Sequence, residues 1–426
     1  MGLCGLGTVG QGVVELLRRN QASIDVQAGR PIELVRVASR TPKPMVDLGG
    51  AAFSTDLADV INDPQVDVVL ELIGGEADAR QLLLQAIEAR KHFVTANKAM
   101  IAAHGDELLP NAYEAGISVG FEAAVGGGIP IIKTLREGLA ANSINWVAGI
   151  INGTSNFILS AMAGKGASFD DALSEAQALG YAEADPTFDI EGVDAAHKLA
   201  IMAALAFDCP IAFPAVYTEG ISTLTAEDIE YAQALGYRIK HLGIARRSAR
   251  GIETRVHPAL VPEQRLLAKV DGVMNAVVIN SDAVGSSLYY GPGAGALPTA
   301  SSVLADVIDI ACNRAARPLS INGEADRLNM AEVDTAYYLR IPAVDQPGVL
   351  AQLAQILSQN AISIEAVIQR EQAIRVTGST SWVPVIILTH RVQEQAMNQA
   401  LETIQALPEV VGQITRIRVE PLDEHA

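Results

Sequence analysis

The sequence has few cysteines, and their positions exclude two kinds of site. Cys4, Cys209 and Cys312 are the only three in 426 residues; they lie far apart, with no CxxC spacing. Neither a disulfide framework nor a structural zinc site is therefore expected. This cysteine usage is typical of a reducing compartment, so we expect a cytoplasmic protein.

Long hydrophobic runs and a basic charge excess are also missing. No uninterrupted apolar stretch approaches the roughly 18 residues of a membrane-spanning helix. The N-terminus lacks the basic and apolar regions of a signal peptide. The 31 Lys and Arg residues are outnumbered by 49 Asp and Glu, which gives a formal net charge of −18. We therefore expect neither a nucleic acid nor a membrane as partner.

The residues that are present indicate an α/β protein of several domains. Hydrophobic residues make up 49% of the chain, and its length suits two or three cores. Strands alternate with helices at the N-terminus, where one helix is expected around His104–Ala115, the middle is mixed, and the C-terminal order is β-α-β-β-α-β. We predict a Rossmann-like parallel sheet over 1–121 with a return segment at about 291–318, an α+β domain over 122–290, a linker over 319–335 and a ferredoxin-like domain over 336–426.

A glycine motif near the N-terminus predicts a dinucleotide site. Gly5, Gly7 and Gly10 match G-x-G-x-x-G ahead of an apolar helix. The first glycine permits a tight turn, the second lets a pyrophosphate approach the backbone, and the third allows close helix packing. Only four residues precede Gly5, so we expect either a short first strand or a start upstream of Met1. The predicted cofactor-binding residues of this turn are Gly5, Leu6, Gly7, Thr8, Val9 and Gly10.

The end of the second predicted strand bears on the choice of cofactor. NAD-binding domains place an acidic residue there to bind the ribose hydroxyls, whereas this chain has Ser39 and Arg40. Arg40 is suited to the 2′-phosphate of NADP, and the alternative is a solvated surface arginine. The pattern favours NADP and leaves NAD open.

A second stretch, from Gly180 to Ala200, concentrates carboxylates in front of a lysine. Its spacing matches no calcium loop, and a solvated loop is the ordinary interpretation of an acidic run. Asp194 and Lys198, however, are four residues apart and share one helix face with apolar residues. Such a pair is either structural or able to move a proton. Lys98 follows a short strand, at the sheet edge where α/β proteins bind ligands. The five carboxylates are Glu183, Asp185, Asp189, Glu191 and Asp194.

Several long motifs in the same order resemble bacterial homoserine dehydrogenase over almost the whole chain. They are GLGTVGQGV, TANKAMIA, FEAAVGGGIPII, GIINGTSNFIL, GYAEADPTFDIEGVDAAHKLAIMA and YYGPGAGALPTASSVLADV. The C-terminal unit, with Asp345-Gln-Pro-Gly348, resembles an ACT domain. The resemblance implies reversible reduction of L-aspartate 4-semialdehyde to L-homoserine by NAD(P)H, in the biosynthesis of threonine, isoleucine and methionine. It also implies that the domain over 122–290 is catalytic and forms dimers.

The resemblance also implies roles for individual residues. Lys198 matches the family's proton donor and Asp194 its orienting partner, while Lys98 matches a lysine near cofactor and substrate that is an alternative acid or base. Which lysine is the dominant acid stays open. Glu183, Asp189, Gly153 and Thr154 match substrate contacts, and Gly295 matches a cofactor contact.

A cation and an effector are implied in the same way. Glu122 and the carbonyls of Val125, Gly127 and Ile129 resemble a sodium site, with a plain glycine hinge as the alternative. Asp345 and Gly348 lie at the first turn of the ACT-like unit, where we expect threonine to bind; a purely oligomerising module is the alternative. We expect a homodimer or a homotetramer.

Three other functions are less compatible with the sequence. Aspartate-semialdehyde dehydrogenase needs an activated cysteine, and neither Cys209 nor Cys312 has a histidine nearby in sequence. Phosphoglycerate dehydrogenase carries its glycine motif in mid-chain. A non-catalytic amino-acid sensor would not need Lys98, Lys198 and the glycine turn together.

Overall fold

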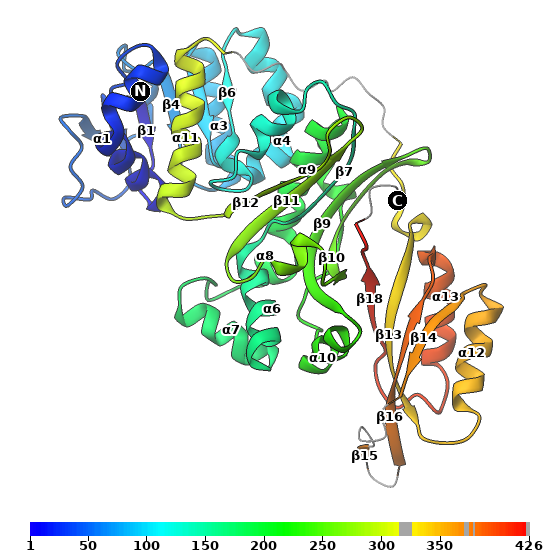
Figure 1. Ribbon diagram of the computed structural model, residues 1–426. Helices are drawn as coiled ribbons and strands as arrows, with labels where there is room; N and C mark the ends of the chain where they lie inside the picture. Colours follow the sequence, from blue (N-terminus) through cyan, green and yellow to red (C-terminus); the bar gives the residue numbers. More distant parts are fainter. Residues whose placement is uncertain (315–325, 370–374, 378–379, 423–426) are drawn as a thin grey trace.

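The computed structural model describes residues 1–314, 326–369, 375–377 and 380–422. Figure 1 shows three parts, with the N-terminal sheet and its helices at the upper left, a mixed domain in the centre and a smaller unit at the lower right. The predicted fold class is confirmed. The predicted domain boundaries stay predictions, and residues 319–325 of the predicted linker lie outside the described residues.

The N-terminal part is built on a parallel sheet of six strands in the order β3-β2-β1-β4-β5-β6. This is the order of dinucleotide-binding folds, in which the strand sequence reverses beside β1. The edge strand β3 was not predicted, because it has only three residues, two of them exposed. The strands are β1 Gly2–Cys4, β2 Arg36–Ala38, β3 Ala52–Ser54, β4 Val68–Glu71, β5 His92–Thr95 and β6 Val119–Gly120.

Helices cover both faces of this sheet. We expected a helix around His104–Ala115, but α4 begins earlier, at Lys98, because the Asn97 side chain accepts the N–H of Met100 and caps the helix. Far along the chain, α11 returns to lie beside α1 (Figure 1), and Gly12 provides the room for the backbone of Ala296. The helices are α1 Thr8–Ala28, α2 Ala58–Asn62, α3 Glu76–Glu88, α4 Lys98–Glu114 and α11 Ala296–Ala311.

The central part is an antiparallel sheet with helices packed against it. Its strands run in the order β12-β11-β7-β9-β10, and α9 contacts β7, β9 and β10. Strands β7 and β12 were not predicted. The strands are β7 Ile144–Ile150, β8 Tyr217–Thr218, β9 Tyr237–Ser248, β10 Gly251–Pro262, β11 Met274–Ser281 and β12 Gly285–Pro292; the helices are α5 Ile131–Lys133, α6 Gly153–Lys165, α7 Phe169–Ala178, α8 Thr187–Ile190, α9 Val193–Phe207 and α10 Ala226–Ala234.

The C-terminal part has the predicted ferredoxin-like order. Strands β18, β13, β16 and β14 form an antiparallel sheet whose apolar face packs on two helices. Two short strands, β15 and β17, were not predicted. The elements are β13 Asp334–Val344, α12 Val349–Gln359, β14 Ile364–Ile368, β15 Arg375–Thr377, β16 Thr380–Thr389, β17 Val392–Gln393, α13 Glu394–Gln405 and β18 Thr415–Val419.

The central and C-terminal sheets are continuous. The last strand, β18, pairs in parallel with β10 through Ala259–Arg418 and Leu260–Val419. Buried ion pairs span the same junction: Arg255 pairs with Glu420, and Arg418 pairs with Glu219. The C-terminal unit is therefore joined to the central domain by backbone hydrogen bonds between strands and by ion pairs.

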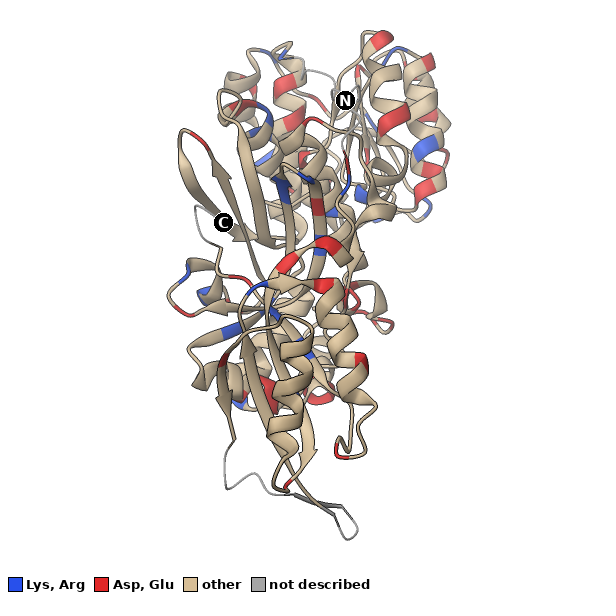
Figure 2. Ribbon diagram, turned by 90° about the vertical axis from the view of Figure 1, so that its right-hand side faces the viewer, with Lys and Arg blue, Asp and Glu red and all other residues tan. Residues whose placement is uncertain are grey.

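The distribution of charged side chains and the length of the apolar helices agree with the sequence analysis. Figure 2 shows acidic side chains recurring along the helices around the parallel sheet, with fewer basic ones among them. No helix among the described residues is long and apolar enough to cross a membrane.

Candidate active site

A cavity of about 530 Å³ lies where the glycine turn, the N-terminus of α4 and the helices of the central domain meet. It brings together nine residues that the sequence analysis had named from six separate segments. These are Val9, Lys98, Gly127, Gly153, Thr154, Asp189, Asp194, Lys198 and Gly295.

The glycine turn has the backbone geometry that its motif predicts. Gly5 has a φ of +102°, and a Cβ there would overlap the carbonyl of Leu72. A Cβ at Gly10 would overlap the carbonyl of Gly5, whereas one at Gly7 would meet nothing within 4 Å. The backbone at Gly7 is thus open to a ligand at the N-terminus of α1, where unpaired N–H groups attract phosphate.

Asp194 lies at the centre of the charged groups in the cavity. One carboxylate oxygen is 2.6 Å from Nζ of Lys198, and the other is 2.9 Å from Nζ of Lys98. The Lys198 ammonium also donates to the carbonyl of Ile151 at 2.8 Å. Lys198 comes from α9 and Lys98 from the first turn of α4, so one carboxylate holds two ammonium groups from different domains.

A residue that sequence reasoning missed, Asn152, completes this arrangement. Its Nδ2 donates to Asp194 at 2.8 Å and to Asp189 at 2.7 Å, while its Oδ1 accepts the N–H of Ser155 and caps α6. An asparagine directly before a helix is a recognised cap signal, which could have drawn attention to it. Its contacts with the two carboxylates could not have been found in this way.

The carboxylates of the site differ in their protonation behaviour. Burial by itself would raise the pKa of Asp194, but the neighbouring Lys198 and Lys98 ammonium groups and the hydrogen bonds hold it well below the usual value. Burial raises the pKa of Asp189, and the Asn152 hydrogen bond opposes that rise. The pocket therefore combines a carboxylate that stays ionised with one that is easier to protonate.

Of the other residues predicted to contact the ligands, some line the cavity and others lie outside it. Thr154 donates its hydroxyl to the carbonyl of Tyr181 at 2.7 Å, and both residues line the cavity. Glu183 is exposed on the loop that follows Tyr181 and does not line the cavity. Arg40 is also outside it, exposed beyond β2, and pairs with no carboxylate among the described residues. A second missed residue, Asn275, lines the cavity with a buried Oδ1 that has no hydrogen-bond partner there.

The segment predicted to bind sodium lies beside the cavity. Both carboxylate oxygens of Glu122 accept backbone N–H groups, from Ile132 and Lys133, each at 2.8 Å. The carbonyl of Gly127 accepts the hydroxyl of Ser302 at 2.6 Å, and that of Ile129 accepts the N–H of Ile131. The side chain of Glu122 is thus engaged in holding the start of α5, and the carbonyls keep a second lone pair each. No cluster of His, Cys, Asp and Glu among the described residues suits a metal ion.

The predicted effector residues lie apart from the cavity. Asp345 and Gly348 are exposed in the turn between β13 and α12, and Gly348 has a φ of +97°. Neither residue lines the active-site cavity.

Family models match most of the chain. Residues 5–122 match the NAD binding domain of homoserine dehydrogenase, and residues 130–308 match the homoserine dehydrogenase family itself. Residues 337–409 match the ACT domain.

Curated proteins and solved structures point the same way. The chain is 55% identical to a homoserine dehydrogenase of Pseudomonas aeruginosa, with 99% of each chain covered, and 39% identical to one of Bacillus subtilis, with 99% and 98% covered. A crystal structure of a homoserine dehydrogenase from Thiobacillus denitrificans superposes with a TM-score of 0.93 at 54% identity, over 99% of this chain and 98% of that one. A hyperthermophilic archaeal homoserine dehydrogenase in complex with NADPH matches at 25% identity and a TM-score of 0.63, over 75% of this chain and 98% of that one.

Proposed function

The chain belongs to the homoserine dehydrogenase family, and on that basis we propose that Lys198, held by Asp194, is its proton donor. The enzyme interconverts L-aspartate 4-semialdehyde and L-homoserine with a nicotinamide dinucleotide, a step towards threonine, methionine and isoleucine. The single observation that carries the proposal is the carboxylate of Asp194 held between two lysines in the wall of the cavity.

The donor count of Lys198 supports its role. An ammonium group has three N–H donors, and Asp194 and Ile151 take two of them. The third is left for the oxygen of the substrate. When bound, the reduced cofactor supplies the hydride to the aldehyde carbon. Lys198 stabilises the charge that develops on the oxygen and supplies its proton.

The remaining residues of the site are proposed to bind and orient the substrate. Asp189 and Glu183 are proposed to bind the ammonium and hydroxyl groups of the substrate, and Gly153 and Thr154 are proposed as further substrate contacts. Lys98 keeps two donors beyond its bond to Asp194 and lies near both ligands, so it is the second candidate acid.

The proposal is tested by replacing each lysine in turn. Lys198→Ala is expected to lower kcat by about 10² to 10⁴ while NADPH still binds, because only the proton donor is removed. Turnover is followed as NADPH oxidation with aspartate semialdehyde, and NADPH binding by fluorescence. Lys98→Ala is measured alongside, and Lys165→Ala, which breaks an exposed ion pair with Glu175, is the control. Normal turnover of Lys198→Ala would refute the assignment.

We propose NADP as the preferred cofactor, held by the glycine turn from Gly5 to Gly10, with Leu6, Thr8 and Val9, and by Lys98 and Gly295. The support is the exposed position of Arg40 beyond β2, where it pairs with no carboxylate in the described part of the chain, and the NADPH complex of the archaeal relative. Arg40→Ala is expected to raise KM for NADPH about tenfold and to leave KM for NADH unchanged. Equal losses for the two cofactors would exclude a 2′-phosphate contact.

We also propose that sodium is held by Glu122 and the carbonyls of Val125, Gly127 and Ile129. The support is that the carbonyls of Gly127 and Ile129 each accept one hydrogen bond and keep a second lone pair. The thermal unfolding temperature is then expected to be higher in sodium chloride than in choline chloride of equal ionic strength. Identical temperatures would contradict the site.

Threonine is proposed as the effector, acting through the ACT domain, whose turn at Asp345 and Gly348 is the site named by the resemblance. A homodimer or homotetramer is proposed as the functional state. The effector proposal is tested by measuring the initial rate at increasing threonine concentrations, and an unchanged rate at millimolar threonine would refute it. Analytical ultracentrifugation tests the second.

A further inference from the structure

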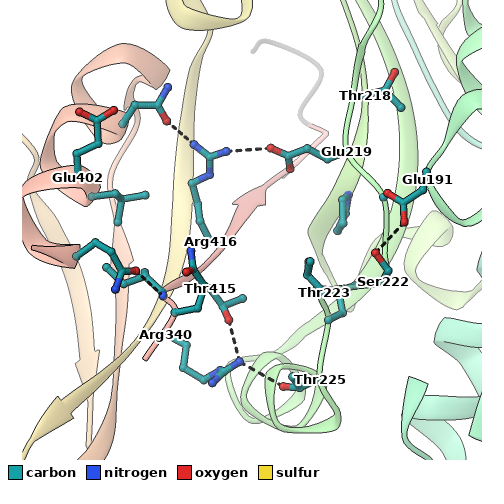
Figure 3. Close-up of a pocket in the computed structure, with 18 of the residues that line it drawn as sticks. Glu191, Thr218, Glu219, Ser222, Thr223, Thr225, Arg340, Glu402, Thr415 and Arg416 are labelled. Carbon is teal, nitrogen blue, oxygen red and sulfur yellow. Dashed lines mark hydrogen bonds and ion pairs between the residues drawn. The ribbon is translucent and has the colours of Figure 1, made fainter. Parts of the chain in front are cut away.

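A second and larger cavity lies between the central domain and the ACT domain. Its volume is about 1030 Å³. Figure 3 shows one wall formed by the loop after β8 together with Glu191, and the opposite wall formed by β13, β18 and α13. We call it the interdomain cleft. None of its lining residues lines the active-site cavity.

Two arginines of the ACT domain reach across the cleft. Arg416 pairs with Glu219 at 2.9 Å and with Glu394 of its own domain at 2.8 Å. Arg340 pairs with Asp228 at 2.7 Å and with Glu227 at 3.5 Å. Figure 3 shows both guanidinium groups directed toward the central domain. The side of the cleft that belongs to the ACT domain therefore presents two guanidinium groups, each held by two carboxylates, and a ligand carboxylate competes with these for the same donors.

Glu191 gives the opposite wall a negative charge without a cationic partner. Its carboxylate accepts the hydroxyl of Ser222 at 2.7 Å, and it forms no ion pair with any cation among the described residues. It is one of the two acidic residues in the 180–200 stretch for which the sequence offered no role. A carboxylate with only one neutral donor is suited to an ammonium group.

We propose that the interdomain cleft binds a small α-amino acid. The ammonium group of the ligand faces Glu191, and its carboxylate faces the guanidinium groups of Arg340 and Arg416 on the other side. Hydroxyl groups between these charges suit a ligand with a small polar side chain. They come from Thr218, Ser222, Thr223, Thr225 and Thr415.

The same wall is connected to the substrate site by backbone and by close packing. The N–H of Ile221 donates to the carbonyl of Ile190 at 2.9 Å, and Gly220 leaves no room for a Cβ against the Glu191 carboxylate. Asp189 and Asp194 flank this point in the sequence. A ligand that displaces Glu191 therefore changes the segment that carries both active-site carboxylates.

This inference rests on the proposed regulation by an amino acid, and it adds a site distinct from the turn at Asp345. The turn follows β13, neither Asp345 nor Gly348 lines the cleft, and no backbone hydrogen bond among the described residues joins the turn to the central domain. The cleft, in contrast, includes residues of both domains.

The test measures binding of L-threonine to the full chain by isothermal titration calorimetry. Glu191→Gln removes the charge, and Thr223→Trp fills the cleft at an exposed position where folding is not at risk. Both substitutions are expected to weaken the binding of L-threonine to the cleft at least about tenfold, which is the usual effect of losing a charged hydrogen bond. Asp185→Asn, an exposed carboxylate of the same segment outside the cleft, is the matched control. Asp345→Asn tests the turn.

Two compounds that each lack one charged group of L-threonine test whether the cleft recognises both the ammonium group and the carboxylate. 3-Hydroxybutyrate lacks the ammonium group and 1-amino-2-propanol lacks the carboxylate, so each is expected to bind at least about tenfold more weakly than L-threonine. Unchanged binding in both Glu191→Gln and Thr223→Trp overturns the proposal. Loss of all binding in Asp345→Asn, or no binding to the unmodified chain, overturns it as well. Turnover without threonine is recorded in parallel, so that a failure of the cleft is distinguished from a failure of the catalytic assignment.

Discussion

At the scale of single residues, the site depends on carboxylates that are held by more than one partner. Asp194 binds Lys198, Lys98 and Asn152 at once, so its orientation is determined by three elements. Such a carboxylate is ionised and immobile, which fixes the position of the Lys198 ammonium group. Removing one partner of Asp194 is expected to lower the rate of the reaction more than the stability of the fold.

Asn152 allows that expectation to be tested, because its two ends act separately. Asn152→Ser keeps an oxygen that can cap α6 but loses the donor to Asp189 and Asp194, whereas Asn152→Ala loses both. Both variants are expected to lower kcat/KM about tenfold or more, since both free the carboxylates. The alanine variant alone is expected to lose a further ~1 kcal/mol of stability.

Steady-state kinetics and urea unfolding measure the two effects of Asn152. A purely structural role would make the losses of activity follow the losses of stability. Equal activity of the serine variant and the unmodified chain would contradict the positioning role.

At the scale of elements, the glycine turn and α1 together make the phosphate site. Gly10 packs the helix onto the turn, and Gly7 leaves the helix N-terminus uncovered. The two glycines therefore have different tasks within one element, and each can be altered by adding a single methyl group.

Gly7→Ala and Gly10→Ala form a matched pair. Alanine at position 7 meets no atom within 4 Å and keeps an allowed φ of −77°, so the fold is expected to be retained while NADPH affinity falls about tenfold or more. Alanine at position 10 overlaps the carbonyl of Gly5, so stability is also expected to fall, by about 1–3 kcal/mol. Fluorescence titration and thermal unfolding measure the two properties. A stable Gly10→Ala variant would contradict the packing role.

At the scale of the whole molecule, the ACT domain is not an appended module. Its last strand extends the central sheet, and Arg255, Glu420 and Arg418 form a buried ionic network at the junction. Breaking such a network by removing one partner leaves a buried charge uncompensated. We therefore expect the two domains to unfold together.

His257 makes this junction sensitive to acid. Its Nδ1 lies 2.8 Å from the carbonyl of Pro258 and its Nε2 2.6 Å from Arg255, so the ring is neutral. Burial, with Arg418 and Arg255 nearby, holds its pKa well below the usual value. Below about pH 6.5 the unfolded chain takes up a proton that the folded chain does not, so stability falls as the pH falls.

The expected slope from this one histidine is up to about 1.4 kcal/mol per pH unit below pH 6.5. Urea unfolding at pH 7, 6 and 5 measures it, and His257→Gln is expected to reduce the slope. His390→Gln, at an exposed position, serves as the control. An identical slope in His257→Gln and the unmodified chain would exclude this origin.

Much of the fold could be predicted because the signals are local. The glycine turn, the alternation of strands and helices, and the β-α-β-β-α-β order are confirmed, since each is written in the spacing of nearby residues. The prediction was less accurate for short or exposed strands such as β3, and for the start of α4, where a single cap at Asn97 decides the boundary. Within the site, Glu183 stays a prediction, because its side chain is exposed and does not line the cavity.

The sequence by itself determined the reaction class, through its resemblance to a known family. It also determined the pairing of Asp194 with Lys198, because a spacing of four residues on a helix puts them on one face. Only the tertiary structure decided that Lys98 and Asn152 reach the same carboxylate, and that β18 joins β10 to enclose the interdomain cleft. These contacts join segments far apart in the chain. They depend on how whole elements pack, and no local pattern of residues encodes them.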